Sequence, residues 1–154
     1  MIATTLLVVL VGTDSKIVLR VSKMVTEEQR QRIGFAVFDT DINELREIRE
    51  ANPFIHTVQT STKLSVGEYL NIDTHARDTW FPVNAILNSK TLTEGAGQVR
   101  AISRMALDTA IRAGNMEPLH NAIENLYKLE EEQSDQALRV IIVSSLAGGT
   151  GSGL

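Results

Sequence analysis

The sequence of 154 residues contains no cysteine, only 5% aromatic residues and three prolines. The absence of cysteine excludes disulfides, thiolate metal sites and a cysteine nucleophile, and it fits a reducing compartment. We therefore expect a cytoplasmic protein. Lys and Arg form no run and the formal net charge is −4, so direct binding to nucleic acid, which usually needs a basic surface, is not expected.

The chain also lacks a membrane span and a metal-binding histidine pattern. Its first apolar run, residues 6–11, is far shorter than the roughly 20 residues that a spanning helix needs. That run has no basic leader and no cleavage site of small residues, so it is not a signal peptide. His56, His75 and His120 do not have the spacing of metal ligands. The length is that of one domain.

Apolar runs and helical spacings alternate along the chain. The continuous apolar run at 6–11 is typical of a strand in a parallel sheet that is buried on both faces, and residues 138–143 repeat its character. Shorter runs at 33–38 and 54–58 predict two more strands. Helices are expected near 17–24, 42–52, 97–114 and 118–132, with helical turns at 66–72 and 83–87.

Strands that alternate with helices predict a three-layer α/β fold with a parallel sheet and right-handed crossovers. We expect the strand order 3-2-1-4, in which the first and last strands are adjacent, because the longest apolar runs belong where both faces are covered.

Ligands of such sheets bind beyond the carboxyl ends of the strands, so the turns after the strands and before the helices are candidate sites. Four turns qualify: Gly12-Thr13-Asp14-Ser15, Asp39-Thr40-Asp41, Glu94-Gly95-Ala96-Gly97-Gln98 and Gly148-Gly149-Thr150-Gly151-Ser152-Gly153. In the last turn, glycines allow backbone amides to approach an anion, and Thr150 and Ser152 add hydroxyl donors. A buried strand leads directly into these glycines, which favours a phosphate loop over a flexible linker.

Two known nucleotide motifs fit less well. A Walker-type loop needs a lysine after its glycines, whereas Ser152 follows Gly151 here. A Rossmann-type dinucleotide site remains an alternative, since Asp39 ends the second strand where an acidic group holds a ribose. Its glycine fingerprint G-x-G-x-x-G is absent from the first turn.

The glycine motifs resemble those of the tubulin superfamily. Gly148–Gly153 resembles the G-G-[GT]-G-[ST]-G signature, and Glu94–Gln98 resembles the G-A-G-[NG] loop before a later helix. Asp39-Thr40-Asp41 is similar to the turn after the second strand of the bacterial cell-division homologue. The order of the motifs is most similar to bacterial tubulin-like proteins, over about residues 6–154. Residues 1–154 would then be the N-terminal portion of a Rossmann-like tubulin nucleotide-binding domain, truncated at its end.

The resemblance implies GTP binding with magnesium, GTP hydrolysis and assembly of copies into head-to-tail filaments. Matched by position, the nucleotide-binding residues are Gly12, Thr13, Asp14, Ser15, Gly95, Ala96, Gly97, Gln98, Gly148, Gly149, Thr150, Gly151 and Ser152. Asp39 or Asp41 would approach the metal through water, with capping of the next helix as the alternative role. No catalytic residue is assigned, because the family's water-activating acidic loop has no counterpart in this sequence.

The first turn departs from the family pattern, which has glycines where Val9, Val11 and Asp14 stand. A carboxylate about 4 Å from a phosphate is unfavourable by about 1 kcal/mol in water and by about 4 kcal/mol at an effective dielectric of 20. A non-catalytic interaction protein with a degenerate nucleotide site is therefore a further alternative. We also expect exposed apolar surface around Ile142 that promotes association.

Overall fold

The computed structural model describes residues 4–10, 15–61, 63–82, 84–91, 99–130 and 137–145. Four parallel strands form one sheet with the order β3-β2-β1-β4. The strands are β1 (Thr5–Leu10), β2 (Ile33–Asp39), β3 (Ile55–Gln59) and β4 (Arg139–Ser144). The predicted strands, their parallel pairing and their order are confirmed.

The register of the sheet brings the strand ends together. Leu10 of β1 lies beside Phe38 of β2 and beside Ser144 of β4. Asp39, the last residue of β2, lies beside Gln59 of β3. All four strands therefore end at one edge, which we call the carboxyl edge.

The helices in the described part of the chain are α1 (Ser15–Met24), α2 (Glu27–Arg30), α3 (Ile42–Ala51), α4 (Val66–Ile72), α5 (Thr74–Thr79), α6 (Ala85–Asn88), α7 (Arg100–Arg112) and α8 (Glu117–Glu130). The sequence analysis missed the short α2 and α5. Gly114, with φ of 76°, follows the end of α7 as expected for a glycine stop. None of the helices described is long and apolar enough to cross a membrane.

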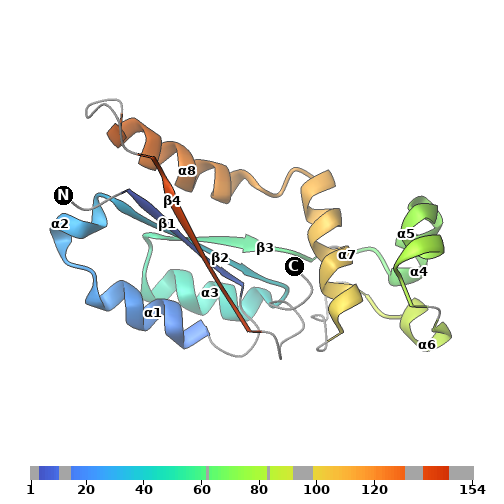
Figure 1. Cartoon of the computed structure of the whole chain (residues 1–154). Coiled ribbons are helices and arrows are strands. Elements are labelled where there is room, and N and C mark those ends of the chain that lie inside the picture. Colours follow the sequence, from blue (N-terminus) through green and yellow to red (C-terminus); the bar gives the residue numbers. More distant parts are fainter. Residues whose placement is uncertain are drawn as a thin grey trace.

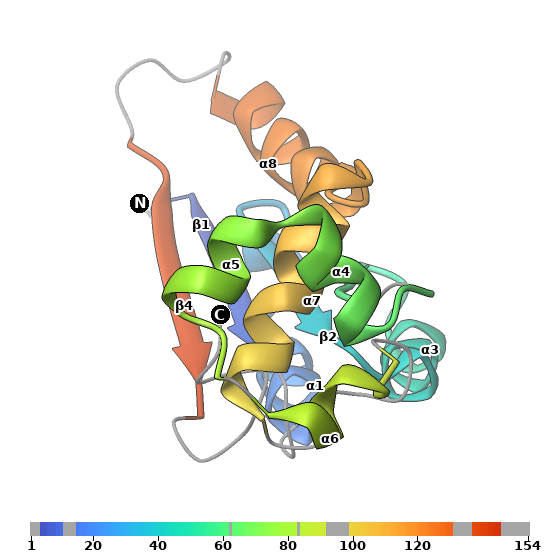
Figure 2. The same cartoon turned by 90° about the vertical axis from the view of Figure 1, so that its right-hand side faces the viewer.

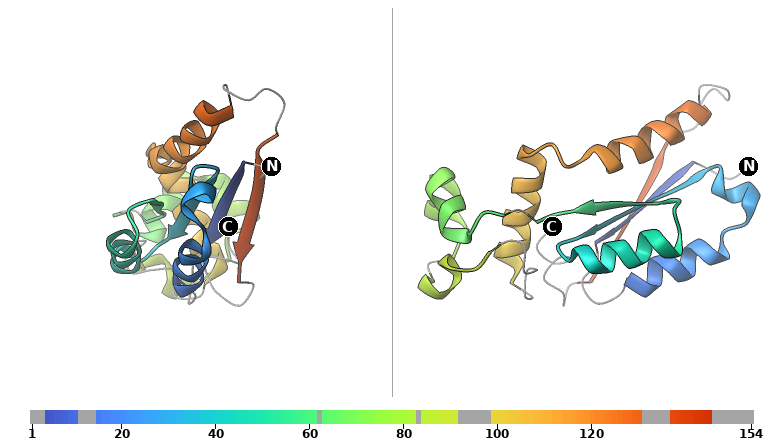
Figure 3. Two further views of the ribbon diagram at one scale, coloured as in Figure 1. Left: turned by 90° about the vertical axis from the view of Figure 1, so that its left-hand side faces the viewer. Right: turned by 180° about the vertical axis from the view of Figure 1, so that it is seen from behind.

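Helices cover the two faces of the sheet and produce three layers (Figures 1 and 3). Side chains of α1 and α3, including Val18 and Ile48, pack with Val9 and Val37 on one face. On the other face α8 packs against the sheet, and an added Cβ at Gly34 would lie 2.9 Å from Leu126 Cδ1. Glycine at that position lets α8 approach β2 closely. The predicted three-layer α/β fold is confirmed.

A separate group of helices lies beyond the carboxyl edge, and we call α4, α5, α6 and the side of α7 that faces them the helical lobe (Figures 1 and 2). Its own apolar cluster consists of buried side chains from these helices and the residues between them: Val66, Tyr69, Leu70, Ala76, Phe81, Ile102 and Met105. The lobe therefore has a core distinct from those on the two faces of the sheet.

Polar contacts also fasten α4 and α5 to α7. The Tyr69 hydroxyl donates a hydrogen bond to Asp108, and the guanidinium of Arg112 pairs with Asp73 at 2.7 Å and with Asp108 at 2.8 Å. The guanidinium carbon of Arg104 lies 4.2 Å from the centre of the Trp80 ring, within the range of a cation–π contact. These contacts fix the orientation of the lobe on α7.

β4 differs from the sequence expectation in its burial. Its apolar run predicts a strand covered on both faces, but β4 is the last strand of the sheet and is largely exposed. Val140 is 51% exposed, Ile141 41% and Ile142 65%. The register explains this, because only β1 pairs with β4 among the described residues. The expected apolar surface at Ile142 is confirmed.

We predict that Ile142→Lys reduces self-association of this chain, because a charge on an exposed strand edge opposes edge-to-edge pairing. Sedimentation velocity at high micromolar concentration should show association of the wild type and a shift toward monomer in the variant. The free energy of unfolding should change by no more than about 0.5 kcal/mol, as is usual for surface positions.

The matched control is Met24→Lys, which changes an apolar side chain that is 81% exposed on α1. It should leave association at the wild-type level. A wild-type chain that sediments as a clean monomer under these conditions would contradict the prediction.

Candidate functional site

Asp39 is the polar residue buried at the end of β2. Its residue surface is only 4% exposed. One carboxylate oxygen, Oδ1, accepts hydrogen bonds from the backbone N–H groups of Thr40 at 2.6 Å and Asp41 at 3.2 Å. The other oxygen, Oδ2, is buried and has no hydrogen-bond donor among the described residues. Such an orphan acceptor is unfavourable unless a proton, a water or a cation satisfies it.

Glu44, on the first turn of α3, interacts with this carboxyl group. Burial raises the pKa of Asp39 to about 6, the hydrogen bonds from Asp41 and Thr40 oppose the rise, and the charge of Glu44 adds to it. The pKa of Glu44 is also raised, first by its own burial and then by the charge of Asp41. Its Oε2 is buried without a donor in the described part of the structure.

Two buried hydroxyl groups also lack a hydrogen-bond partner among the described residues, and one of them follows the strand next to Asp39. Thr60 follows β3 and donates its backbone N–H to the carbonyl of Asp39 at 2.8 Å, while its Oγ1 is buried without a partner in the described chain. Ser103, on the first turns of α7, is fully buried and its Oγ is likewise unpartnered there. Polar side chains that have no internal partner suggest a polar ligand or ordered water at this edge.

Glu44, Thr60 and Ser103 were not predicted from the sequence as site residues. Thr60 could have been found by the argument that pointed to Asp39, since it lies close after the predicted strand 54–58 and directly follows the observed β3. Glu44 has the position of an ordinary residue in the first turn of a helix. Nothing in the sequence indicates that Ser103 is buried.

Asp41 and Ser15 lie in the described part of the chain, but not all of their predicted roles are tested there. Asp41 caps α3, because its Oδ1 accepts a hydrogen bond from the backbone of Asn43 at 2.8 Å. The capping alternative is thus confirmed, and a metal contact through water remains a prediction for Asp39 and Asp41. Ser15 is the first residue of α1, the helix that follows β1, and its contact with a nucleotide also remains a prediction.

The glycine-containing turns lie outside the described residues. This applies to Gly12, Thr13 and Asp14, to Gly95, Ala96, Gly97 and Gln98, and to Gly148, Gly149, Thr150, Gly151 and Ser152. The described chain reaches Leu10 and Ser145 at the carboxyl edge and resumes at Val99, just before α7. The nucleotide contacts of these turns remain predictions.

The start of α7 is suited to an anion. Val99 occupies the N-cap position and its side chain cannot cap the helix, and the first turn contains no acidic residue. Val99 therefore gives this 13-residue helix no side-chain cap. The positive end of the helix dipole attracts negative charge.

The donor set at the edge fits magnesium better than a softer metal. It consists of carboxylate and hydroxyl oxygens, which Mg²⁺ prefers, and Mg²⁺ usually takes one or two carboxylates together with waters and phosphates. The described residues contain no group of three or more His, Cys, Asp or Glu side chains arranged to hold a metal ion. A metal at this edge would therefore need ligands beyond these side chains.

We predict that Asp39→Asn stabilises the protein at pH 7.5 in the presence of a chelator, by about 1–3 kcal/mol. The folded state holds the Asp39 proton up to a pKa of about 6, against an ordinary pKa of 3.8. The folded state therefore binds more protons between these values, and its stability falls as pH rises through that interval. Two pKa units correspond to about 3 kcal/mol at most.

Urea unfolding between pH 4 and pH 7.5 measures this pH dependence. The free energy of unfolding should fall less steeply with pH in Asp39→Asn than in the wild type. Glu50→Gln is the matched control, since it removes one carboxylate from an exposed position on α3 that does not act on Asp39 or Glu44. It should keep the wild-type pH dependence. The same pH dependence in Asp39→Asn and the wild type would show that Asp39 is not the titrating group.

Comparisons with known proteins show which family this chain belongs to. Neither the curated proteins nor the solved structures contain a match. A family model described as tubulin like matches residues 6–154, nearly the whole chain. This match agrees with the resemblance of the glycine turns and with the parallel sheet in the order β3-β2-β1-β4. The chain belongs to the tubulin-like family.

Proposed function

We propose that this chain binds GTP together with magnesium at the carboxyl edge of the sheet. Membership of the tubulin-like family supports a guanine nucleotide. The alignment of the strand ends supports the location, because ligands of open parallel sheets bind beyond those ends. The glycine turns of the sequence would supply backbone donors to the phosphates.

The buried carboxyl group of Asp39 is the observation that carries the proposal. Its Oδ2 lacks a donor among the described residues, and the group is 4% exposed. A buried acid with a pKa raised to about 6 is unfavourable for folding at neutral pH. Magnesium with its waters near Asp39 and Asp41 would compensate that charge and connect it to the phosphates.

The start of α7 is the second element of the proposed site. The positive end of its helix dipole would attract the terminal phosphate, next to the predicted contacts of Gly95–Gln98. Gly148–Ser152 would enclose the inner phosphates, as the family resemblance implies. The same resemblance supports hydrolysis that needs an acidic group of a neighbouring copy, and head-to-tail assembly in the cytoplasm.

We predict weak GTP binding that depends on magnesium and that Asp14→Gly strengthens. Removal of a carboxylate about 4 Å from a phosphate should raise affinity between about fivefold and a thousandfold, depending on the local dielectric. Gly149→Asp should abolish binding, since it adds a charge and a side chain to the phosphate loop. Titration calorimetry at one fixed salt concentration compares the three proteins, because salt screens the electrostatic part.

The same titrations with NAD test the dinucleotide alternative. Equal or tighter NAD binding would favour a Rossmann-type site over the proposed one. Failure of the wild type and of Asp14→Gly to bind either nucleotide would favour an interaction protein with a degenerate site. Unchanged GTP binding by Gly149→Asp would show that the phosphate loop is elsewhere.

A further inference from the structure

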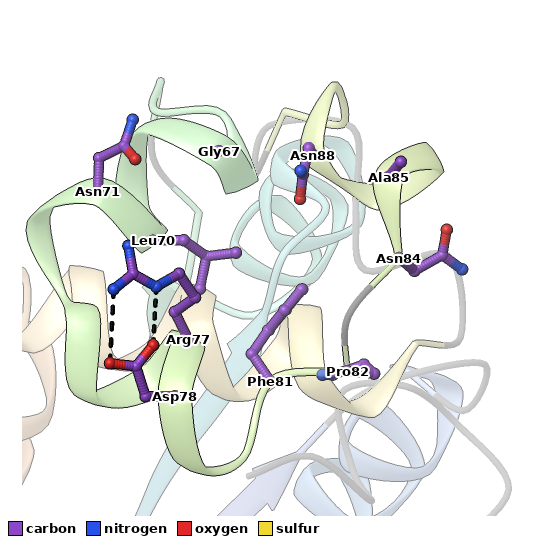
Figure 4. A pocket seen from close by; sticks show the side chains of 10 residues that line it. All are labelled: Gly67, Leu70, Asn71, Arg77, Asp78, Phe81, Pro82, Asn84, Ala85 and Asn88. Atoms are coloured by element: carbon purple, nitrogen blue, oxygen red, sulfur yellow. Dashed lines mark hydrogen bonds and ion pairs between the residues drawn. The ribbon is translucent and has the colours of Figure 1, made fainter.

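The helical lobe contains a pocket that is separate from the carboxyl edge (Figure 4). It has a volume of about 560 Å³ and lies between α4, α5 and α6. This volume is within the usual range of about 300–1,000 Å³ for small-ligand pockets. Leu70 and Phe81, which are 7% and 6% exposed, supply apolar surface. The pocket is thus large enough for one apolar group and the polar atoms around it.

The walls of the pocket are held in place before any ligand binds. The backbone N–H of Val66, at the start of α4, donates to the carbonyl of Lys90 at 2.9 Å. Ser65 and Thr91 form an antiparallel bridge beside it. A Cβ added at Gly67 would lie 3.2 Å from the carbonyl oxygen of Asn88, which shows how closely α4 and α6 approach. A ligand would therefore meet a preformed site rather than order it.

The charges at the pocket do not favour an ionic ligand. Among the described residues that line it, Arg77 and Asp78 are the only charged ones. Arg77 donates to Asp78 through Nε at 2.8 Å and through a terminal nitrogen at 3.4 Å (Figure 4). The guanidinium is therefore already engaged with a carboxylate, and a phosphate or carboxylate ligand would have to displace that partner.

The pocket also lacks an exposed aromatic face for a nucleobase. Phe81 is the only aromatic side chain among the described lining residues, and it is 6% exposed. Its ring packs edge-on with Trp80, with 6.0 Å between ring centres. Recognition of bases usually relies on stacking against an accessible aromatic ring. A nucleotide is thus disfavoured by both the ring and the paired charges.

Carboxamide side chains are the remaining polar groups. Asn71 stands on α4, and Asn84 and Asn88 stand on the opposite side of the opening at α6 (Figure 4). The Oδ1 of Asn84 accepts from the backbone of Ile86 at 3.0 Å, so its amino group remains a donor. Each carboxamide carries both donors and an acceptor, as the peptide group does. An asparagine is therefore complementary to the peptide groups on either side of a side chain.

We infer that this pocket binds a short peptide segment of a partner protein, with one leucine-sized apolar side chain above Leu70 and Phe81 and the adjacent peptide groups bound by Asn71 and Asn88. Neutral peptide groups satisfy the carboxamides without disturbing the Arg77–Asp78 pair. The residues that line the pocket include none of the residues proposed to contact the nucleotide. The pocket gives the helical lobe a role in recruiting another protein.

Titration of the ¹⁵N-labelled protein with N-acetyl-leucine methylamide, followed by NMR, tests the inference. This probe presents one leucine side chain between two peptide groups. The side-chain amide signals of Asn71 and Asn88 should shift and saturate at millimolar concentration. Loss of one hydrogen bond in Asn88→Ala or Asn71→Ala should weaken binding about fivefold. Ala85→Phe, which fills the pocket from α6, should abolish the shifts.

Asn43→Ala is the matched control, because Asn43 is an exposed asparagine on α3, outside the pocket. It should bind the probe as the wild type does. Two further probes, N-acetyl-leucine with its free carboxylate and adenosine, should bind at least fivefold more weakly. Equal or tighter binding of either, or no saturable shift at Asn71 and Asn88, would overturn the inference. So would wild-type affinity in both Asn71→Ala and Asn88→Ala.

Discussion

β1 pairs in parallel with β2 on one side and with β4 on the other, in register from Thr5 to Leu10. Parallel pairing in this register forces the three strands to end together, and β3 ends with them because Asp39 lies beside Gln59. Helices that return the chain between parallel strands must then cover the faces, which leaves the carboxyl edge for the turns. The place of the candidate site follows from this pairing.

The carboxyl edge combines burial with unsatisfied polarity. Asp39 and Glu44 hold their carboxyl groups where burial raises the pKa of both, and Thr60 adds an unpartnered hydroxyl in the described chain. Buried polar groups that destabilise the fold in this way are common at ligand-binding sites. The helical lobe shows the opposite balance, since Tyr69, Asp73, Asp108 and Arg112 satisfy one another across α4 and α7. The polar groups of the helical lobe thus stabilise its fold, whereas those at the carboxyl edge do not.

The sequence predicts the architecture well because its signals are local. The apolar run 6–11 and the spacing of Val18 and Val21 determine β1 and α1 with little help from distant residues. The exposure of β4 was not predictable in this way, since the same apolar pattern fits a central and an edge strand. In the helical lobe, α4, α6 and α7 were predicted as helical segments, but α5 was not, because it has a weak apolar pattern. The attachment of α4 and α5 to α7 was also not predictable, because it uses pairs such as Asp73–Arg112, which are 39 residues apart. At the site, Asp39 was found from its strand, whereas Glu44 and Ser103 became visible only through tertiary packing.

The central claim is that the carboxyl edge holds a nucleotide with a divalent cation. Replacement of Mg²⁺ by paramagnetic Mn²⁺ in the complex with a non-hydrolysable GTP analogue tests it directly, since Mn²⁺ broadens NMR signals only near its own position. The account predicts selective broadening of the backbone signals of Thr40, Asp41 and Thr60, with the signals of Asn71 and Asn88 retained. Retained signals at Thr40, Asp41 and Thr60 in the saturated complex, or broadening centred on the helical lobe, would contradict it.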